Sequence, residues 1–247
     1  QKMKDVPMEP PVLIIAGKVV NFYKIKMPQR ILYTGTNPQK YQALGHIIHW
    51  PMIEIRPVEF TTAAIQSLVD KVTQCHMITL TSRYAVKYFF ETLVKNSFSL
   101  ELLKNKDFIV IGIDTAQALK EYRVTPTVQA NIETSEGVLA ALKSRYDLKG
   151  KNILFPRSAL PNPFLKEELG KLGAKVDEFK IYENVKPIKR PLPEAINKIF
   201  FTSPSTVKNF LDDYGDIPPD WEILSKGPIT KKYLETQGYK SEILIYE

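Results

Sequence analysis

Hydroxyl groups that could bind anions occur in two patterns, and each pattern appears twice along the chain. The copies are Thr81-Ser82 and Thr202-Ser203, followed further on by Gly112-x-x-Thr115 and Gly227-x-x-Thr230. Serine and threonine side chains cap helix starts, where free backbone N–H groups and the helix dipole attract anions. The repeated patterns therefore predict two similar anion-binding surfaces, although helix capping alone would explain any one of these hydroxyls.

The segments around these patterns alternate between apolar strands and amphipathic helices. Continuous apolar runs predict buried parallel strands at 30–35, 76–81, 107–113, 152–156 and 198–202. Apolar stripes at helical spacing follow both Thr-Ser pairs, formed by Val86, Phe89, Phe90 and Leu93 and by Val207, Phe210, Leu211 and Tyr214. Alternating strands and helices predict an α/β fold whose parallel sheets are covered by helices.

The order of the repeated parts indicates two similar parallel-sheet α/β domains, one of them discontinuous. We expect an N-terminal extension at 1–29, a discontinuous domain 1 formed by 30–54 and 186–247, and an inserted domain 2 at 59–180. The two crossings, at 51–60 and 179–191, would form a two-stranded connector. Ligands of open parallel sheets bind beyond the carboxyl ends of the strands, so we expect the site in the cleft between the domains.

Composition excludes several other kinds of protein. The 247 residues are 44% hydrophobic and 25% charged, and no apolar run is long enough to span a membrane. The single cysteine, Cys75, excludes an internal disulfide, which favours a cytoplasmic location. A net charge of +7 would attract a polyanion; the alternative is that the charge only forms a solvated basic surface without a binding role. Because the basic residues are dispersed, we expect no nucleic-acid partner.

Motifs for metal and cofactor chemistry are missing from the sequence. The three histidines, His46, His49 and His76, have no helical metal-ligand spacing, and the first two are expected in a strand. The chain has no phosphate-binding G-x-x-x-x-G-K-[ST] loop, no G-x-G-x-x-G after a strand and no G-x-S-x-G elbow. We therefore expect no metal and no cofactor, and chemistry that relies on hydroxyls, backbone donors and dispersed cations.

Six segments together resemble the uroporphyrinogen-III synthase family. They are "FTSPSTVKNFL", "GPIT", "GIDTAQAL", "EGVLAAL", "ILFPRSA" and "FKIYENV", and the similarity covers about residues 30–240. The resemblance implies two α/β domains with the active site between them and no cofactor. It also implies conversion of hydroxymethylbilane, a linear tetrapyrrole polycarboxylate, into uroporphyrinogen III, with inversion of the last pyrrole ring and loss of water. Positioning and preorganised hydrogen bonding would then matter more than strong acid–base chemistry.

The resemblance also implies roles for particular residues. Tyr182, in the connector, matches the family's tyrosine and is the candidate general acid for departure of the hydroxyl group, with packing at the hinge as its alternative. The family's hydrogen-bonding threonines fall at Thr115 and Thr230. Substrate-binding positions fall at Thr81, Ser82, Arg83, Ser135, Glu136, Gly137, Arg157, Ser158, Thr202, Ser203, Ser205, Gly227 and Ile229. Arg83 and Arg157 are the expected cations, although either could be a merely exposed arginine.

Several positions depart from the family pattern. The first strand ends in Thr34-Gly35-Thr36 where the family has Thr-Arg-Pro, which removes a cation, and Thr230 is followed by Lys231 rather than alanine. The chain stops at "EILIYE", where the family continues with a helix. "PPVLIIAGKVV", near the N-terminus, resembles the closing strand of uroporphyrinogen-III C-methyltransferases, so a fused or associated methyltransferase domain upstream is expected, or else an unrelated edge strand.

A non-catalytic module is the alternative to an enzyme. Two domains that close on a tetrapyrrole or another polycarboxylate could bind it without turnover, using the same hydroxyls and backbone donors. In either case we expect a small-molecule substrate or ligand, no membrane partner and a monomer. An assay that resolves the product isomers separates the two possibilities, because only the enzyme yields the inverted isomer.

Overall fold

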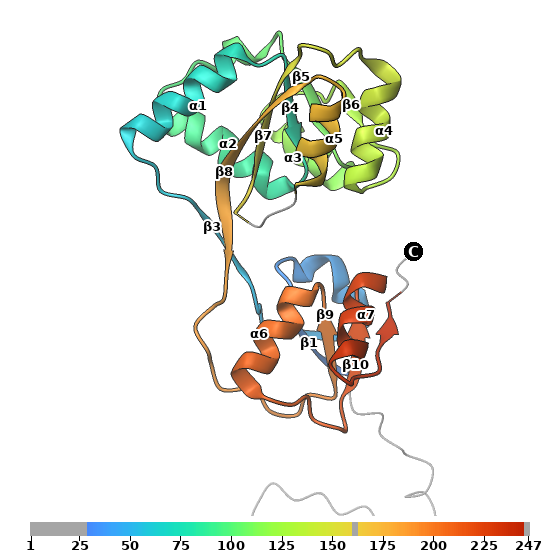
Figure 1. Cartoon of the computed structure of the whole chain (residues 1–247). Helices are drawn as coiled ribbons and strands as arrows, with labels where there is room; N and C mark the ends of the chain where they lie inside the picture. Colours follow the sequence, from blue (N-terminus) through green and yellow to red (C-terminus); the bar gives the residue numbers. More distant parts are fainter. Residues whose placement is uncertain (1–28, 160–162, 245–247) are drawn as a thin grey trace, which may run out of the picture. The chain divides into compact units, whose positions relative to one another are not determined.

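A computed structural model of the chain describes residues 29–159 and 163–244. The N-terminal segment that resembles a methyltransferase strand lies outside the described residues. The chain divides into two compact units: unit 1 combines the segments up to Trp50 and from Arg190 onward, and unit 2 is Pro51–Lys189 (Figure 1). Both units are built on sheets in which parallel pairs predominate, which confirms the expected α/β class with one discontinuous part.

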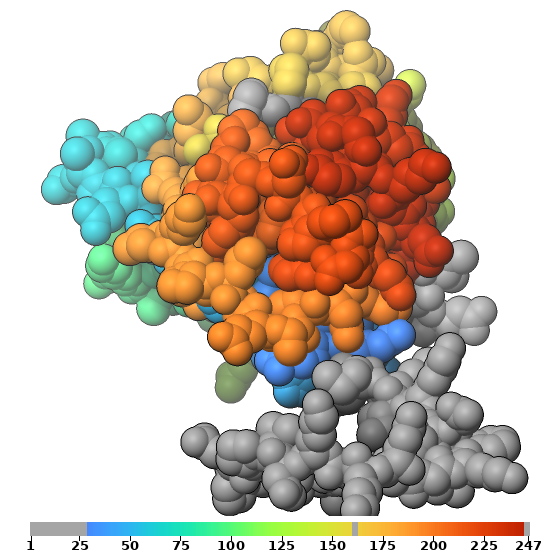
Figure 2. Space-filling view, turned by 90° about the horizontal axis from the view of Figure 1, so that it is seen from below, coloured from blue at the N-terminus to red at the C-terminus, as the bar shows by residue number. Residues whose placement is uncertain are grey.

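Unit 1 contains a five-stranded sheet in the order β11-β10-β9-β1-β2, and all of its strand pairs are parallel. Its strands are β1 (Arg30–Tyr33), β2 (His46–His49), β9 (Lys198–Phe201), β10 (Glu222–Ser225) and β11 (Glu242–Ile243). Its helices are η2 (Pro38–Leu44), α6 (Pro204–Tyr214) and α7 (Pro228–Thr236). Because β1 lies between β9 and β2, chain segments from the two ends of the sequence pack together, as the blue and orange surfaces of Figure 2 show.

Unit 2 contains a six-stranded sheet in the order β3-β8-β7-β4-β5-β6. Its strands are β3 (Glu54–Pro57), β4 (Met77–Leu80), β5 (Asp107–Val110), β6 (Val128–Gln129), β7 (Asn152–Ser158) and β8 (Lys175–Val185). Its helices are α1 (Thr62–Gln74), α2 (Arg83–Lys95), η3 (Leu100–Leu103), α3 (Ile113–Glu121), α4 (Ser135–Arg145) and α5 (Phe164–Lys171). The β3–β8 pair is antiparallel and carries the chain into and out of this unit, as expected of the connector.

Alternate strand residues of unit 2 face two separate apolar clusters. Ile78 and Leu80 pack with α1, α2 and α3 on one face, whereas Met77 packs with α4 and α5 on the other. Figure 1 shows α1 and α2 on the opposite side of the sheet from α4 and α5. Strands that are buried on both faces read as continuous apolar runs, which explains why the sequence shows them so clearly.

The helix stripes predicted after the two Thr-Ser pairs are both present, but they differ in depth. In α2 all four stripe residues are buried. In α6 Val207 and Phe210 are fully buried, whereas Leu211 and Tyr214 are only half-buried. Tyr214 instead uses its hydroxyl oxygen to accept a hydrogen bond from Trp50 Nε1 at 3.1 Å and its proton to bond the carbonyl of Arg190 at 2.8 Å. The second stripe therefore ends in a polar contact that ties together the two chain segments of unit 1.

All five strands predicted from the sequence differ in length from the observed ones: β4 and β9 by no more than one residue at each end, and β1, β5 and β7 by two or three residues at their C-terminal end. β1 ends at Tyr33 and β5 ends at Val110, because a loop or a helix start follows directly in each case. β7 runs on past the predicted end to Ser158, through Pro156. Proline is tolerated there because β7 pairs with β4 only at Ile153 and Leu154, so no ladder bond to β4 is lost.

Candidate active site

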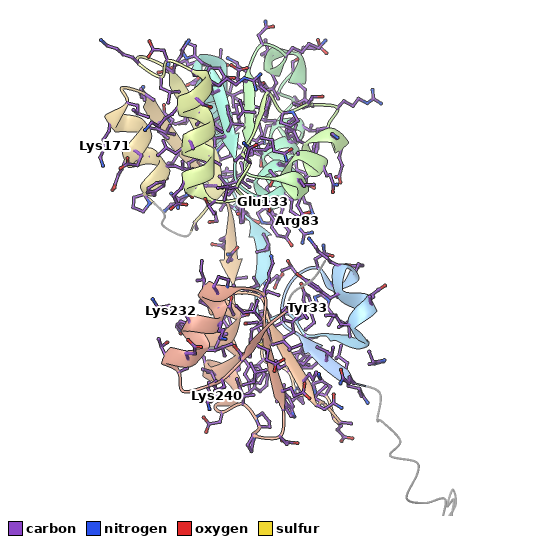
Figure 3. All side chains as sticks on the ribbon, turned by 90° about the vertical axis from the view of Figure 1, so that its right-hand side faces the viewer. Tyr33, Arg83, Glu133, Lys171, Lys232 and Lys240 are labelled. Carbon is purple, nitrogen blue, oxygen red and sulfur yellow. The ribbon has the colours of Figure 1, made fainter. Side chains whose placement is uncertain are left out.

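The predicted site residues lie where strands end and helices begin, at the carboxyl edge of each sheet. In unit 2, β4 leads into α2, β5 into α3 and β6 into α4; in unit 1, β9 leads into α6 and β10 into α7. Figure 3 shows Arg83 and Glu133 at the same end of unit 2. Carboxyl edges are the usual place for ligands of parallel sheets.

A phenol and two serine hydroxyls meet at this edge of unit 2. Ser82 caps α2, because its Oγ accepts a hydrogen bond from the backbone N–H of Ala85 at 3.0 Å. The same Oγ lies 2.9 Å from the hydroxyl oxygen of Tyr182 on β8. Ser158, at the end of β7, is in register with Tyr182 and also hydrogen-bonds to its hydroxyl. Strand register and a helix cap thus bring together three hydroxyls that are distant in the sequence.

The environment of Tyr182 keeps its phenol protonated at neutral pH. Only 8% of the residue is exposed, and this burial raises the pKa of Tyr182 above its ordinary value. Hydrogen bonding with Ser82 and Ser158 and the positive charge of Arg157 lower the pKa, while Tyr84 raises it. The side chain is therefore a proton donor rather than a base under these conditions.

The two arginines expected to bind carboxylates differ in their contacts. Arg83, the first residue of α2, lies over the ring of Tyr84 at 4.9 Å and donates a hydrogen bond to its hydroxyl at 2.9 Å. Arg157 forms an ion pair with Glu178 of β8, and its side chain is only 11% exposed. Lys166 also reaches Glu178, at 3.4 Å. Arg157 is therefore engaged by a carboxylate of its own chain, which sequence reasoning missed.

The two predicted threonines occupy equivalent places. Thr115 is the third residue of α3 and Thr230 the third residue of α7, and they are 3% and 4% exposed. Neither hydroxyl makes a hydrogen bond within the described part of the chain. Among the described residues neither oxygen is one of the buried polar atoms that lack a partner, so each hydroxyl reaches the surface, where a ligand can contact it.

The glycines that precede these helices have different surroundings. Glu133, in the loop before α4, accepts a hydrogen bond from the backbone N–H of Ile113 at 2.9 Å, at the first residue of α3. A Cβ placed on Gly112 would lie 2.0 Å from the same carboxylate oxygen. Around Gly227, before α7, a Cβ would meet no atom of the described residues within 4 Å. The start of α3 is thus covered by an acidic side chain, and the start of α7 is open. Sequence reasoning missed Glu133, because its role depends on how the loop folds back.

The segment from Ser135 to Gly137 does open a helix, but the cap is the preceding residue. Thr134 is the N-cap of α4, and its Oγ1 accepts a hydrogen bond from the backbone N–H of Gly137 at 3.1 Å. A Cβ on Gly137 would lie 2.0 Å from the carbonyl oxygen of Ile132. Glycine is needed here for packing against the loop, and its N–H is already used. The binding roles predicted for Ser135 and Glu136 stay predictions.

The corresponding edge of unit 1 is formed by the second Thr-Ser pair. Ser203 and Thr206 form a capping box, with Ser203 Oγ accepting from the backbone N–H of Thr206 and Thr206 Oγ1 accepting from that of Ser203. Thr202 lies against Gly35, where a Cβ would be 2.6 Å from its Cγ2 atom. The loop after β1 therefore packs closely on Thr202, which explains why a glycine stands where the family has an arginine. Ser205, in the first turn of α6, is partly exposed.

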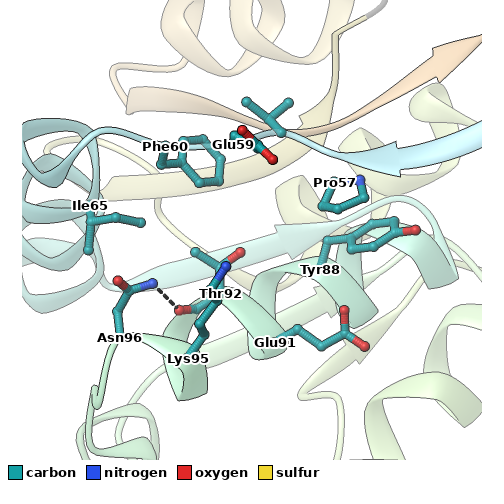
Figure 4. Close-up of a pocket in the computed structure, with 10 residues that line it drawn as sticks. Pro57, Glu59, Phe60, Ile65, Tyr88, Glu91, Thr92, Lys95 and Asn96 are labelled. Atoms are coloured by element: carbon teal, nitrogen blue, oxygen red, sulfur yellow. Dashed lines mark hydrogen bonds between the residues drawn. The ribbon is translucent and has the colours of Figure 1, made fainter.

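A pocket of 540 Å³ in unit 2 lies apart from these residues. It is formed by the loop after β3, the beginning of α1 and the second half of α2, and Phe60, Tyr88 and Lys95 are among its lining residues (Figure 4). None of the predicted site residues lines it. Tyr88 connects the two regions, because its ring centroid lies 6.1 Å from that of Tyr182.

Comparisons with known proteins agree with the resemblance noted in the sequence. The profile of the family described as "Uroporphyrinogen-III synthase HemD" matches residues 39–244. The uroporphyrinogen-III synthase of Chlorobaculum parvum is 28% identical, covering 79% of this chain and 81% of that protein. A putative uroporphyrinogen-III synthase of Methanocaldococcus jannaschii is 32% identical, covering 66% and 70%. The porphyrin biosynthesis protein HemD of Ruminiclostridium josui is 25% identical, covering 88% of this chain but only 47% of that longer protein.

Solved structures show the same fold. The uroporphyrinogen-III synthetase of Helicobacter pylori has a TM-score of 0.64 at 21% identity, covering 87% of this chain and 92% of that one. A mutant uroporphyrinogen III synthase of Thermus thermophilus has a TM-score of 0.59 at 19% identity, covering 87% and 91%. Among the described residues, no helix is long and apolar enough to cross a membrane. The match to the family profile over most of the sequence shows that this chain belongs to the uroporphyrinogen-III synthase family.

Proposed function

We propose that the chain converts hydroxymethylbilane into uroporphyrinogen III, with inversion of the last pyrrole ring, ring closure and loss of one water molecule. The observation that carries this proposal is the protonated, nearly buried phenol of Tyr182, held by two serine hydroxyls at the carboxyl edge of unit 2. Membership of the synthase family supports the same reaction.

Tyr182 acts as the general acid. The substrate's hydroxyl group leaves as water once it receives a proton, and the leaving group takes the bonding electrons with it. A phenol with a pKa of about 10 or above is protonated at neutral pH and can donate at this step. The inverted product requires that the ring be turned before closure, so the rest of the site mainly restrains the substrate's conformation.

The two threonines and the helix starts bind the polar groups of the substrate. Thr115 and Thr230 each present a hydroxyl that has no partner in the described protein. The start of α7, at Gly227, offers free backbone N–H groups and the positive end of a helix dipole. Substrate carboxylates are bound by the side chains of Thr81, Arg83, Arg157, Thr202, Ser203 and Ser205 and by the backbone at Ile229 and at the helix start of Ser135 and Glu136.

The hydroxyl-bearing edges of both units act on the same substrate molecule. The net charge of +7 favours association with a polycarboxylate at either edge. We place the reaction in the cytoplasm, carried out by a monomer that needs neither metal nor organic cofactor. A methyltransferase domain fused or associated upstream would use the product.

The decisive test is an assay with freshly prepared hydroxymethylbilane that separates the product isomers. We expect the type III isomer, and treatment of the protein with a chelator should leave the rate unchanged. Exclusive formation of the type I isomer, which arises without an enzyme, would contradict the proposal. Tight binding of the substrate without faster turnover would instead support a non-catalytic binding module.

A further inference from the structure

The Oγ atom of Ser82 has two neighbours, and together they favour one direction of a hydrogen bond. It accepts from the backbone N–H of Ala85 at 3.0 Å, and it lies 2.9 Å from the hydroxyl oxygen of Tyr182. A serine hydroxyl has one proton to donate and two lone pairs. An N–H bond into one lone pair, at the positive end of a helix, draws electron density from the oxygen and makes its O–H a better donor.

A phenol whose oxygen accepts from serine keeps its own proton free. If Tyr182 donated to Ser82, its proton would be held inside the protein and would be unavailable to a substrate. If Ser82 and Ser158 both donate, they fill the acceptor positions of the phenol oxygen and leave the Tyr182 proton for an outside acceptor. The same two donors would then stabilise the phenolate that remains after the proton has been transferred.

We propose that Ser82 is a positioning residue for Tyr182: it donates its hydroxyl proton to the phenol oxygen, with Ser158 as a second donor, and so directs the Tyr182 proton toward the substrate. The inference rests on the proposed function, and it changes the role expected of Ser82. Ser82 was expected to bind a substrate carboxylate, but its proton is directed to Tyr182 instead. Within the described part of the chain, the side chain of the pseudo-equivalent Ser203 bonds to its own helix.

Other polar and charged groups near Tyr182 come from three elements. Tyr84 and Tyr88 of α2 flank its ring at centroid distances of 6.2 and 6.1 Å. On β7, Arg157 lies close enough to lower the pKa, and its charge is compensated by Glu178. On β3, Glu54 and Arg56 pair with each other. Neither serine changes charge, so their replacement alters the hydrogen bonds to the phenol without removing any of these charges.

The test compares Ser82→Ala with a matched variant, Thr61→Ala. Thr61 caps α1 in the same unit by accepting from the backbone N–H of Ala64 at 3.3 Å, so its removal also costs one cap without touching Tyr182. We expect Ser82→Ala to lower kcat about 10- to 100-fold with KM within about twofold, whereas Thr61→Ala keeps kcat. Ser82→Thr retains both the cap and the donor and should recover most of the rate. Circular dichroism and Tm of both alanine variants show whether they fold.

Two further measurements distinguish a hydrogen-bond donor to Tyr182 from a residue that only supports the structure. The hydrogen bonds with Ser82 and Ser158 lower the pKa of Tyr182, so losing either of them should raise this pKa. The alkaline limb of the pH–rate profile should therefore move to higher pH in Ser82→Ala and in Ser158→Ala. In a Tyr182→Phe background, adding Ser82→Ala should change kcat by less than about twofold, because Ser82 acts through the phenol.

Particular outcomes would overturn the inference while leaving the proposed function intact. An unchanged kcat with a raised KM would show that Ser82 binds a substrate carboxylate after all. A full additional loss in the Tyr182→Phe background, or an alkaline limb that moves to lower pH, would show that the bond runs the other way or plays no part. Failure of the proposed function is a separate result, since the unmodified protein would then yield only the type I isomer.

Discussion

In unit 2 the start of α3 is covered by the carboxylate of Glu133, whereas in unit 1, at the start of α7 with the same Gly-x-x-Thr pattern, a Cβ on the glycine would meet no described atom within 4 Å. The two Thr-Ser pairs also differ in their contacts. Ser82 contacts the phenol of Tyr182, while Ser203 forms a capping box with its own helix. The duplicated sequence pattern therefore produces a helix start at equivalent positions in both units. The side chains that contact each helix start differ between the units.

This difference suggests different roles for the two units, with chemistry in unit 2 and binding of carboxylates in unit 1. In unit 2 the polar groups at the carboxyl edge already contact one another, as expected of groups held in place for chemistry. In unit 1 the start of α7 has no side-chain cap, so its N–H groups and the Thr230 hydroxyl are available, as expected of a surface that receives carboxylates. Substitution of Tyr182 in unit 2 should therefore affect mainly kcat, whereas changes at a helix start that receives carboxylates should affect mainly KM.

The largest expected effect comes from Tyr182→Phe. Loss of the proton donor should lower kcat by about 100-fold or more, while KM changes little because the ring and its neighbours Tyr84 and Tyr88 stay in place. In the unmodified protein, activity should fall as the pH rises through the pKa of Tyr182, and burial places this fall above the ordinary tyrosine range. Steady-state kinetics across pH measure both. A loss confined to KM would reverse the assignment of chemistry to unit 2.

Thr230→Val should have the next largest effect on function. The substitution keeps the side-chain shape and removes a hydroxyl that has no partner within the described protein, so Tm should stay the same or rise slightly. We expect kcat/KM to fall about 10-fold, from loss of one hydrogen bond to a charged substrate. Thr115→Val is the matched variant and should cost less, because Glu133 covers the start of its helix. Equal losses for the two variants would argue against the asymmetry.

Stability measurements on Gly112→Ala and Gly227→Ala test, without substrate, whether the starts of α3 and α7 differ in their surroundings. Both variants replace a glycine N-cap with alanine, which disfavours a helix start to a similar degree. Only at position 112 must the new Cβ also displace the Glu133 carboxylate and break its bond to Ile113. We expect Gly112→Ala to be less stable than Gly227→Ala by about 1 kcal/mol in urea unfolding. Introducing Glu133→Ala should remove most of this difference, and its persistence would point to another cause.

The sequence predicts the framework well, because the framework depends on local patterns. The stripe from Val86 to Leu93 and the capping serines Ser82 and Ser203 need only neighbouring residues, and all occur as expected. The contacts that distinguish the units depend on chain segments far apart. The bond between Ser82 and Tyr182 requires β4 to pair with β7 and β7 with β8, and the second pairing also brings Arg157 within reach of Glu178. Periodicity and capping rules carry no information about such contacts.

Substitution of Glu133 should have the smallest effect, and it should improve substrate binding rather than weaken it. Glu133→Gln removes a negative charge at the carboxyl edge of unit 2 and weakens the competitor for the N–H of Ile113, so KM for the anionic substrate should fall about two- to fivefold. Glu121→Gln, at the other end of α3, removes the same charge away from this edge and should leave KM nearly unchanged. The effect should shrink at high salt, because the groups involved are exposed. A KM that rises in Glu133→Gln would mean that the carboxylate organises the loop for binding, and the two helix starts would then be closer in function than their surroundings suggest.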